Sequence, residues 1–232
     1  MRKIYLFVIF LALGLFAAAQ SDEDRWVDSV YNSLTAEQRV GQLINVRANL
    51  PNQAYFAEVQ ELIKKYDIGG VTFFRTNAEP LLKQVNVWQA MAQTPLMVGI
   101  DGEWGLGMRL NDAISYPYQM TLGAVQNQEL IGEMGCQIAE QCRRLGINID
   151  FAPDVDVNNE PKNPVIGMRS FGEDPKQVAQ RGAHYALALQ NNGERSRLMK
   201  PHLHCHHDQP DLVDLEDHGT KRRKIRLKSS CR

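Results

Sequence analysis

The sequence has no excess of charge of either sign, with 26 Lys and Arg residues against 27 Asp and Glu residues in a chain of 232. A balanced chain exerts no long-range attraction on nucleic acid or on an acidic partner, so its composition supports neither class of partner. Cysteine is also scarce. Two of the four cysteines, Cys136 and Cys142, lie in one helix-like segment at a spacing that does not share a helix face. We therefore expect buried, apolar thiols there rather than a disulfide.

The apolar run from Ile4 to Phe16 is shorter than the roughly 20 residues that a membrane-spanning helix needs. Arg2 and Lys3 precede it, and three alanines end it before Gln20. This is the layout of a secretory signal peptide, which we predict over residues 1–19. No cysteine follows the alanines, which argues against a lipoprotein anchor. We expect the mature chain to be exported to the periplasm or the extracellular space, with no stable membrane anchor.

Aromatic residues are absent from residues 194–232, although this segment holds five of the six histidines. A segment this polar cannot bury enough surface to offset its ordering entropy, so we predict that it is disordered or foreign to the domain. Its ligand-type side chains are His202, His204, Cys205, His206 and His207. Imidazole and thiolate suit zinc or copper, but the spacing is not that of a zinc finger, and we expect no metal site. The basic run KRRKIRLK is interpreted as solvated charge.

From Asp22 to Gly193 the apolar pattern alternates between helix and strand. Four short apolar strands are predicted, near Ile44–Arg47, Val71–Phe74, Leu96–Ile100 and Ile147–Phe151. Strands of this kind, separated by amphipathic helices, favour an α/β fold with a parallel sheet. Four strands cannot close an eight-stranded barrel, which normally needs about 250 residues.

Sites in parallel α/β proteins form at the carboxyl ends of the strands, and this rule selects several acidic residues. Asp101 ends the apolar strand PLMVGI and is the strongest candidate, with Glu103 and Trp104 directly after it. A flat indole ring beside glycines suits the face of a sugar. Asp154 and Asp156 follow the next strand, and we favour a structural role for both.

Arg169 lies in a loop, residues 158–172, whose path is fixed by prolines and glycines. An arginine held on a rigid loop loses little entropy when it binds oxygen ligands. An ordinary salt bridge to Glu173 or Asp174 explains the residue equally well. Spacing alone leaves both interpretations open.

Four segments, PLMVGIDGEWG, YPYQMTLGA, LGINIDFAPDVDVNN and NPVIGMRSFGEDP, occur in this order. Together they resemble the N-terminal barrel of glycoside hydrolase family 3, over about Thr35 to Gly193. The resemblance implies a parallel (β/α) TIM-type barrel of which only about the first half is present, in residues 20–193. The asparagine and NPVIG before RSFG resemble the β-N-acetylglucosaminidase (β-N-acetylhexosaminidase) branch, with a β-glucosidase as the alternative.

The resemblance implies that Asp101 and Arg169 bind the sugar next to the broken bond, facing each other across the pocket. Glu103, Trp104 and Asp154 are then candidates for the pocket wall. Members are retaining hydrolases that need no metal or organic cofactor, and the expected partner is a carbohydrate, an N-acetylglucosaminide or a glucoside.

The sequence departs from the family pattern after LQNNG, where a lysine–histidine motif should follow and ERSRLMKPHLHCHHDQPD stands instead. The strand that carries the nucleophile is not found either, so no catalytic residue is assigned. Our hypothesis is a break of the coding frame or gene model at about Gly193. A truncated, inactive hydrolase or a non-catalytic sugar-binding remnant would result.

Overall fold

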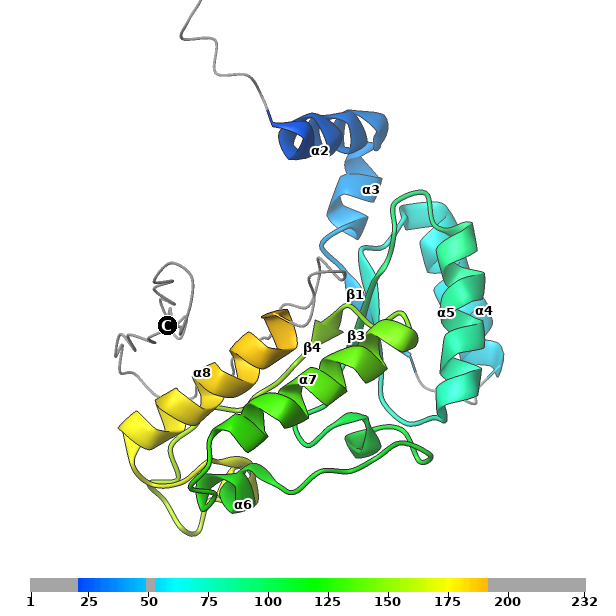
Figure 1. Ribbon diagram of the computed structural model, residues 1–232. Coiled ribbons are helices and arrows are strands. Elements are labelled where there is room, and N and C mark those ends of the chain that lie inside the picture. The colour runs from blue at the N-terminus through cyan, green and yellow to red at the C-terminus, as the bar shows by residue number, and fades with distance from the viewer. Residues whose placement is uncertain (1–20, 49–52, 192–232) are drawn as a thin grey trace, which may run out of the picture.

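The structure is a computed structural model that describes residues 21–48 and 53–191 (Figure 1). The predicted signal peptide over residues 1–19 and the predicted disordered segment over residues 194–232 lie outside these residues and stay predictions. Within the described part of the chain, no helix combines the length and apolarity that a membrane crossing requires.

Four parallel strands form one sheet in the order β1-β2-β3-β4. The strands are β1 (Asn45–Ala48), β2 (Gly70–Phe73), β3 (Met97–Ile100) and β4 (Ile149–Asp150). Consecutive strands are neighbours, with Val46 level with Val71, Val71 with Val98, and Ile100 with Asp150. The α/β class and the four parallel strands predicted from the sequence are confirmed.

Helices connect the strands and cover one face of the sheet. The α-helices are α2 (Asp22–Ser33), α3 (Ala36–Gly41), α4 (Gln53–Tyr66), α5 (Ala78–Met91), α6 (Gln119–Gly123), α7 (Glu129–Arg144) and α8 (Pro175–Asn191), and the 3-10 helices are η1 (Leu106–Met108) and η2 (Gly167–Arg169). Figure 1 shows α4 and α5 together at one end of the sheet and α7 and α8 side by side at the other.

The core lies between the sheet and these helices. Strand β2 is buried along its whole length, as is typical of a strand inside a parallel sheet. Trp88 of α5 stacks near Phe73 of β2 at 5.9 Å between ring centroids, and meets Phe56 of α4 edge-on at 5.8 Å. At the other end, Gly135 brings α7 close to α8, because a Cβ there would lie 2.8 Å from the Cβ of Ala188.

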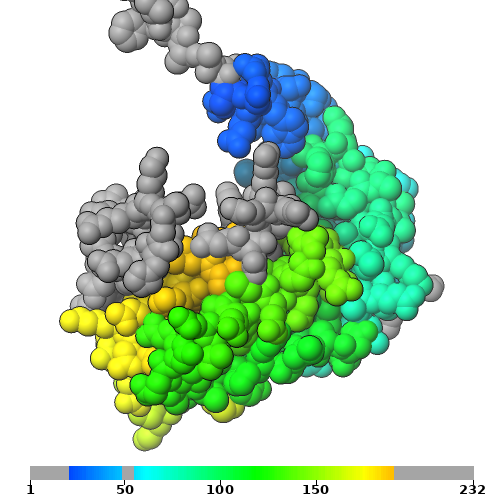
Figure 2. All heavy atoms as spheres, in the orientation of Figure 1, coloured from blue at the N-terminus to red at the C-terminus, as the bar shows by residue number. Residues whose placement is uncertain are grey.

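Helices α2 and α3 project from one end of the molecule, as Figure 2 shows. Thr35 followed by Gln38 three residues later is the sequence pattern that predicts a capping box. The structure confirms it, since Thr35 Oγ1 accepts the Gln38 N–H and Gln38 Oε1 accepts the Thr35 N–H. None of the residues of α2 is buried, and Trp26 is 58% exposed. An apolar cavity of about 370 Å³ lies between α3 and α4, and Val40 and Leu62 are among its lining residues.

Candidate functional site

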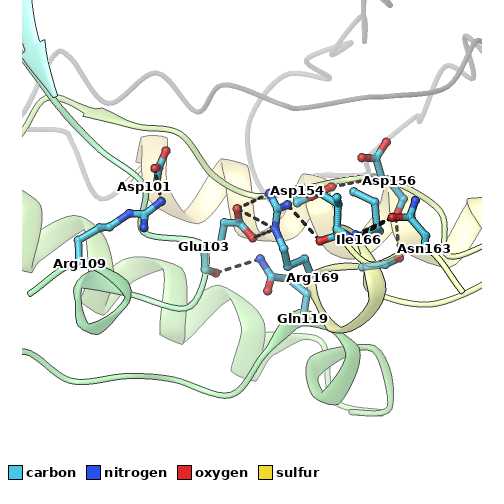
Figure 3. Close-up of polar contacts among 11 residues, drawn as sticks. Asp101, Glu103, Arg109, Gln119, Asp154, Asp156, Asn163, Ile166 and Arg169 are labelled. Carbon is cyan, nitrogen blue, oxygen red and sulfur yellow. Dashed lines mark hydrogen bonds and ion pairs between the residues drawn. The ribbon is translucent and has the colours of Figure 1, made fainter. Parts of the chain in front are cut away.

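The loops after β3 and β4 meet at the carboxyl edge of the sheet and bring most of the predicted site residues together (Figure 3). The loop after β3 carries Asp101, Glu103 and Trp104, and the long loop after β4 carries Asp154 and Arg169. This is the edge that the rule for parallel sheets selects. The ion pair between Arg169 and Glu103 joins the two loops, whereas the ion pair between Arg169 and Asp154 lies within the loop after β4.

Asp101 directly follows β3 and forms an ion pair with Arg109 through Oδ2. Both side chains are about three-quarters buried, with 22% of Asp101 and 23% of Arg109 exposed. The turn around η1 returns Arg109 to the end of its own strand, and Gly105 in that turn has φ 85°, a conformation that favours glycine. The Arg109 guanidinium carbon also lies 5.0 Å from the centroid of the Phe74 ring.

Arg169 forms a forked pair with Glu103. Its Nε donates to Oε1 at 3.2 Å and Oε2 at 2.9 Å of Glu103, and Nη2 donates to Oε1 at 2.7 Å. Nη1 donates to the Val165 carbonyl at 3.3 Å. The Glu103 carboxylate is 4% exposed, whereas 29% of the Arg169 side chain is exposed. The hydrogen bonds that Arg169 donates to Glu103 raise the pKa of Arg169, so the guanidinium stays charged.

One of the two interpretations of the sequence was a salt bridge of Arg169 to Glu173 or Asp174. Arg169 does form salt bridges, but with Glu103 and Asp154, so the partners predicted from the sequence are wrong. Asp174 instead accepts the N–H groups of Lys176 and Gln177 at 2.8 and 3.2 Å and so begins α8. The residues that pair with Arg169 are distant in sequence. In Figure 3, the pair of Asp101 and Arg109 lies on one side of Glu103, and Arg169 lies on the other side.

Asp154 is a second acidic partner of Arg169. Its Oδ2 lies 3.1 Å from Arg169 Nη2, an ion pair without hydrogen-bond alignment, while its Oδ1 accepts the Asp156 N–H at 2.9 Å. Asp154 is 1% and Asp156 is 5% exposed. Burial raises the pKa of Asp154 to about 6, and the Asp156 N–H works against that rise. Both residues therefore hold the loop, which agrees with the structural role favoured from the sequence.

The candidate wall residues differ in what they can offer a ligand. Glu103 and Asp154 are buried and pair with Arg169, so their carboxylates are not exposed to a ligand. Trp104 is half-buried, and its ring tilts at 59° against Tyr118 with centroids 4.6 Å apart. Of these three predicted wall residues, only Trp104 exposes a substantial part of its side chain at the site.

Asp150, the last residue of β4, is buried beneath the loop after β3. Its Oδ1 accepts the Gly102 N–H at 2.8 Å, and a Cβ on Gly102 would lie 2.9 Å from its Oδ2. Burial raises the pKa of Asp150 to about 7; the bond from Gly102 lowers it, and the charges of Asp101 and Glu103 raise it.

Sequence reasoning missed Arg109, Gln119 and Tyr185 at this site. Gln119, in the resemblance segment YPYQMTLGA, is fully buried and donates to the Glu103 carbonyl at 3.2 Å. Tyr185 donates to the Gly102 carbonyl at 3.1 Å. The glycines of GEWGLG indicate a tight turn and are the one sequence signal that points to Arg109, because such a turn returns the chain to the strand end.

Residues 21–48 and 53–191 contain no group of three or more His, Cys, Asp or Glu side chains arranged to hold a metal ion. The histidine cluster at 202–207 lies outside the residues that the structure describes.

Comparisons with known proteins give the family. Residues 35–209 match the family described as "Glycosyl hydrolase family 3 N terminal domain", a match that continues past Gly193. The chain is 36% identical over 154 residues to "Beta-hexosaminidase A" of Pseudoalteromonas piscicida, covering 61% of this chain and 26% of that protein. It is 28% identical over 184 residues to "Beta-N-acetylglucosaminidase/beta-glucosidase" of Cellulomonas fimi, covering 78% of this chain and 32% of that protein.

A solved structure shares the fold. The glycoside hydrolase family 3 β-N-acetylglucosaminidase from Paenibacillus sp. str. FPU-7 superposes with a TM-score of 0.62 at 36% identity, over 69% of this chain and 32% of that one. The chain thus spans about a third or less of the length of these three relatives. Four parallel strands with intervening helices agree with part of a (β/α) barrel. The family match, the shared fold and the order of the sequence motifs agree: this chain belongs to glycoside hydrolase family 3.

Proposed function

We propose that this chain binds the terminal β-linked N-acetylhexosamine of a carbohydrate, as the sugar-binding part of a retaining glycosidase. Membership of the family and the names of the relatives, β-hexosaminidase and β-N-acetylglucosaminidase, support this substrate class. The observation that carries the proposal is the way Glu103 holds Arg169 while part of the guanidinium remains available.

The donors of Arg169 can be counted. An arginine has five N–H groups. One on Nε, one on Nη2 and one on Nη1 are used by Glu103 and the Val165 carbonyl. The second N–H on Nη1 remains, whereas Nη2 also lies 3.1 Å from Asp154 Oδ2. A guanidinium that is fixed in place, is 29% exposed and keeps this donor suits a sugar oxygen. A salt bridge and sugar binding are therefore compatible, because Glu103 orients the arginine for a ligand.

Asp101 complements this donor as an acceptor. Arg109 contacts its Oδ2, and Oδ1 has no partner among the residues that the structure describes. A hydroxyl that donates to this oxygen would form a charge-assisted bond. Hydrogen bonds to charged groups contribute about 1.5–3 kcal/mol each, so loss of either Asp101 or Arg169 should weaken sugar binding measurably.

Hydrolysis by retention needs a nucleophile and an acid/base. The family resemblance implies segments for both that this sequence does not match. We infer that the 232-residue chain binds sugar without turning it over, and that full-length relatives supply the catalytic pair. Glucosides are the second substrate candidate, since the Cellulomonas fimi relative is named for both activities.

Titration of N-acetylglucosamine and of glucose into the purified chain tests this proposal. We expect saturable binding that prefers N-acetylglucosamine, at least a tenfold loss of affinity in Arg169→Lys, and no release from a chromogenic N-acetylglucosaminide. Arg143→Lys is the control, because Arg143 pairs with Glu140 at the exposed surface of α7. Product release would disprove the absence of turnover, and tighter binding of glucose would favour the β-glucosidase alternative.

We also propose export, on the signal-peptide layout of residues 1–19. N-terminal sequencing of the chain recovered from a secreting host should begin at Gln20. A mature chain that retains Met1 would contradict cleavage.

A further inference from the structure

Three successive peptide groups of the loop after β3 bond to side chains from three other elements. The Gly102 N–H donates to Asp150 of β4 at 2.8 Å, the Gly102 carbonyl accepts from Tyr185 of α8 at 3.1 Å, and the Glu103 carbonyl accepts from Gln119 of α6 at 3.2 Å. These side chains are 1%, 0% and 0% exposed, respectively. Side chains so deeply buried keep fixed positions, because the surrounding core is close-packed.

The loop has little regular structure of its own to hold it. Residues 101–105 lie outside the named strands and helices. Their loop main-chain bonds are Gly105 N–H to the Gly102 carbonyl at 2.8 Å, Tyr116 N–H to the Trp104 carbonyl at 2.9 Å and Met108 N–H to the Gly105 carbonyl at 3.1 Å. The path of the chain between Asp101 and Trp104 therefore depends on the side chains beneath it.

This path sets the position of both acids that serve the site. Asp101 and Glu103 flank Gly102, and they face different arginines, Arg109 and Arg169. A shift of the Gly102 peptide would move both carboxylates at once. The contact is tight, since the Asp150 carboxylate occupies the space where a Cβ of residue 102 would lie.

We propose that Asp150, Gln119 and Tyr185 are positioning residues that hold the main chain of Asp101–Trp104, so that Asp101 meets the sugar and Glu103 meets Arg169. The part that concerns the sugar rests on the proposed function. The part that concerns Glu103 and Arg169 does not, because that pair is present without a ligand.

The test uses two replacements of similar size at one position. Asp150→Asn keeps an oxygen acceptor for the Gly102 N–H, whereas Asp150→Leu removes it and leaves a buried donor without a partner. Gln119→Met removes the donor to the Glu103 carbonyl and provides a second variant if Asp150→Leu does not fold. Tyr55→Phe is the control, since it removes a hydroxyl bond to the Arg47 carbonyl at the distant strand β1.

Three quantities are measured on the full chain: the affinity for N-acetylglucosamine, the exchange rates of the Gly102 amide and the Arg169 Nε–H by NMR, and the urea midpoint. We expect Asp150→Leu to weaken binding about tenfold and to speed both exchange rates about tenfold. Asp150→Asn should stay within about twofold of the wild type, Gln119→Met should show about a fivefold loss, and Tyr55→Phe should leave all rates at the site unchanged.

Several results would overturn the proposal. One is a folded Asp150→Leu or Gln119→Met variant with wild-type exchange at Gly102 and Arg169. Another is an Asp150→Asn variant as impaired as Asp150→Leu, which would assign the effect to charge rather than to the acceptor. Faster exchange with unchanged affinity would refute the role toward the sugar. If the wild type binds no N-acetylglucosamine, the proposed function fails, and the Arg169 Nε–H exchange still decides the role toward Glu103.

Discussion

Asp101 and Asp150 stand at the ends of neighbouring strands and have opposite surroundings. Asp101 follows Ile100, is partly exposed, and pairs with Arg109 at the edge of the sheet. Asp150 is level with Ile100 itself and is buried on the side where Cys142 of α7 and Tyr185 of α8 pack. Because side chains alternate between the faces of a strand, a difference of one position separates an acid available to a ligand from an acid enclosed in the core.

The comparison teaches that an acid at a strand end is not by itself a site residue. Its position relative to the neighbouring strand decides its surroundings, and those decide its chemistry. Glu103 is an intermediate case: it lies at the edge of the sheet, but its carboxylate is buried in the ion pair with Arg169. The three predictions below test how different these acids are, in order of the expected effect.

Asp150 should dominate the dependence of stability on pH. Its pKa rises from 3.8 to about 7 on folding, so the folded chain keeps a proton that the unfolded chain releases above about pH 4. The resulting stability is complete below pH 4 and is lost as pH rises through about 7. Between pH 4 and pH 8, we expect the unfolding free energy of the wild type to fall by on the order of 4 kcal/mol. In Asp150→Asn this fall should be absent, because asparagine does not titrate.

Urea denaturation of the wild type and Asp150→Asn over this range measures the difference. The groups around Asp150, which are Asp101, Glu103, Cys142 and Tyr185, are the same in both proteins. Parallel stability curves for the two proteins would show that Asp150 titrates at its ordinary pKa.

Glu103→Gln should destabilise the fold next most strongly. It removes the buried negative charge that faces Arg169 and leaves the guanidinium with the ion pair to Asp154 and the bond to the Val165 carbonyl. Breaking a buried pair from one side costs about 3 kcal/mol of unfolding free energy. The control is Glu79→Gln, which breaks an exposed pair with Lys83 and should leave the urea midpoint unchanged. Equal midpoints for both variants would mean that the Glu103–Arg169 pair contributes no more than a surface pair.

Arg109→Gln should have the smallest effect on stability. The Asp101–Arg109 pair is less buried than the Glu103 carboxylate, so its loss should cost about 1.5 kcal/mol of unfolding free energy, the low end for a hydrogen bond to a charged group. Its effect on sugar affinity should be larger than on stability, because Asp101 loses the partner that orients it. Thermal denaturation together with sugar titration separates these effects. A large fall in stability with unchanged affinity would reverse our assignment of this pair.

The parts of the fold predicted from the sequence depend on local patterns. The strand predicted over Val71–Phe74 is observed over Gly70–Phe73, because a continuous apolar run specifies a buried parallel strand. The caps by Thr35 and Asp174 are also local, since their partners lie within three residues. Gln177 shows the limit of such patterns. Its spacing from Asp174 predicts a capping box, but its side-chain oxygen accepts from Arg181 one turn later.

The pairing of Arg169 with Glu103 was not predictable from local patterns. These residues are 66 positions apart, and only the folded sheet brings their loops together. Gln119 shows the same limit, since a fully buried amide leaves no trace in the apolar pattern. The edge of the sheet that holds the candidate site was predicted from the strands, whereas the ion pairs within it come from tertiary structure.

Gly102 and Gly132 illustrate how differently two glycines of this chain would respond to selection. At Gly102 even the single methyl group of alanine would meet the Asp150 carboxylate, whereas at Gly132 in α7 a Cβ would meet nothing within 4 Å. Alanine in a helix interior is more favourable than glycine by about 1 kcal/mol. A randomised library selected only for folded product should therefore discard every substitution at position 102 and enrich alanine at position 132.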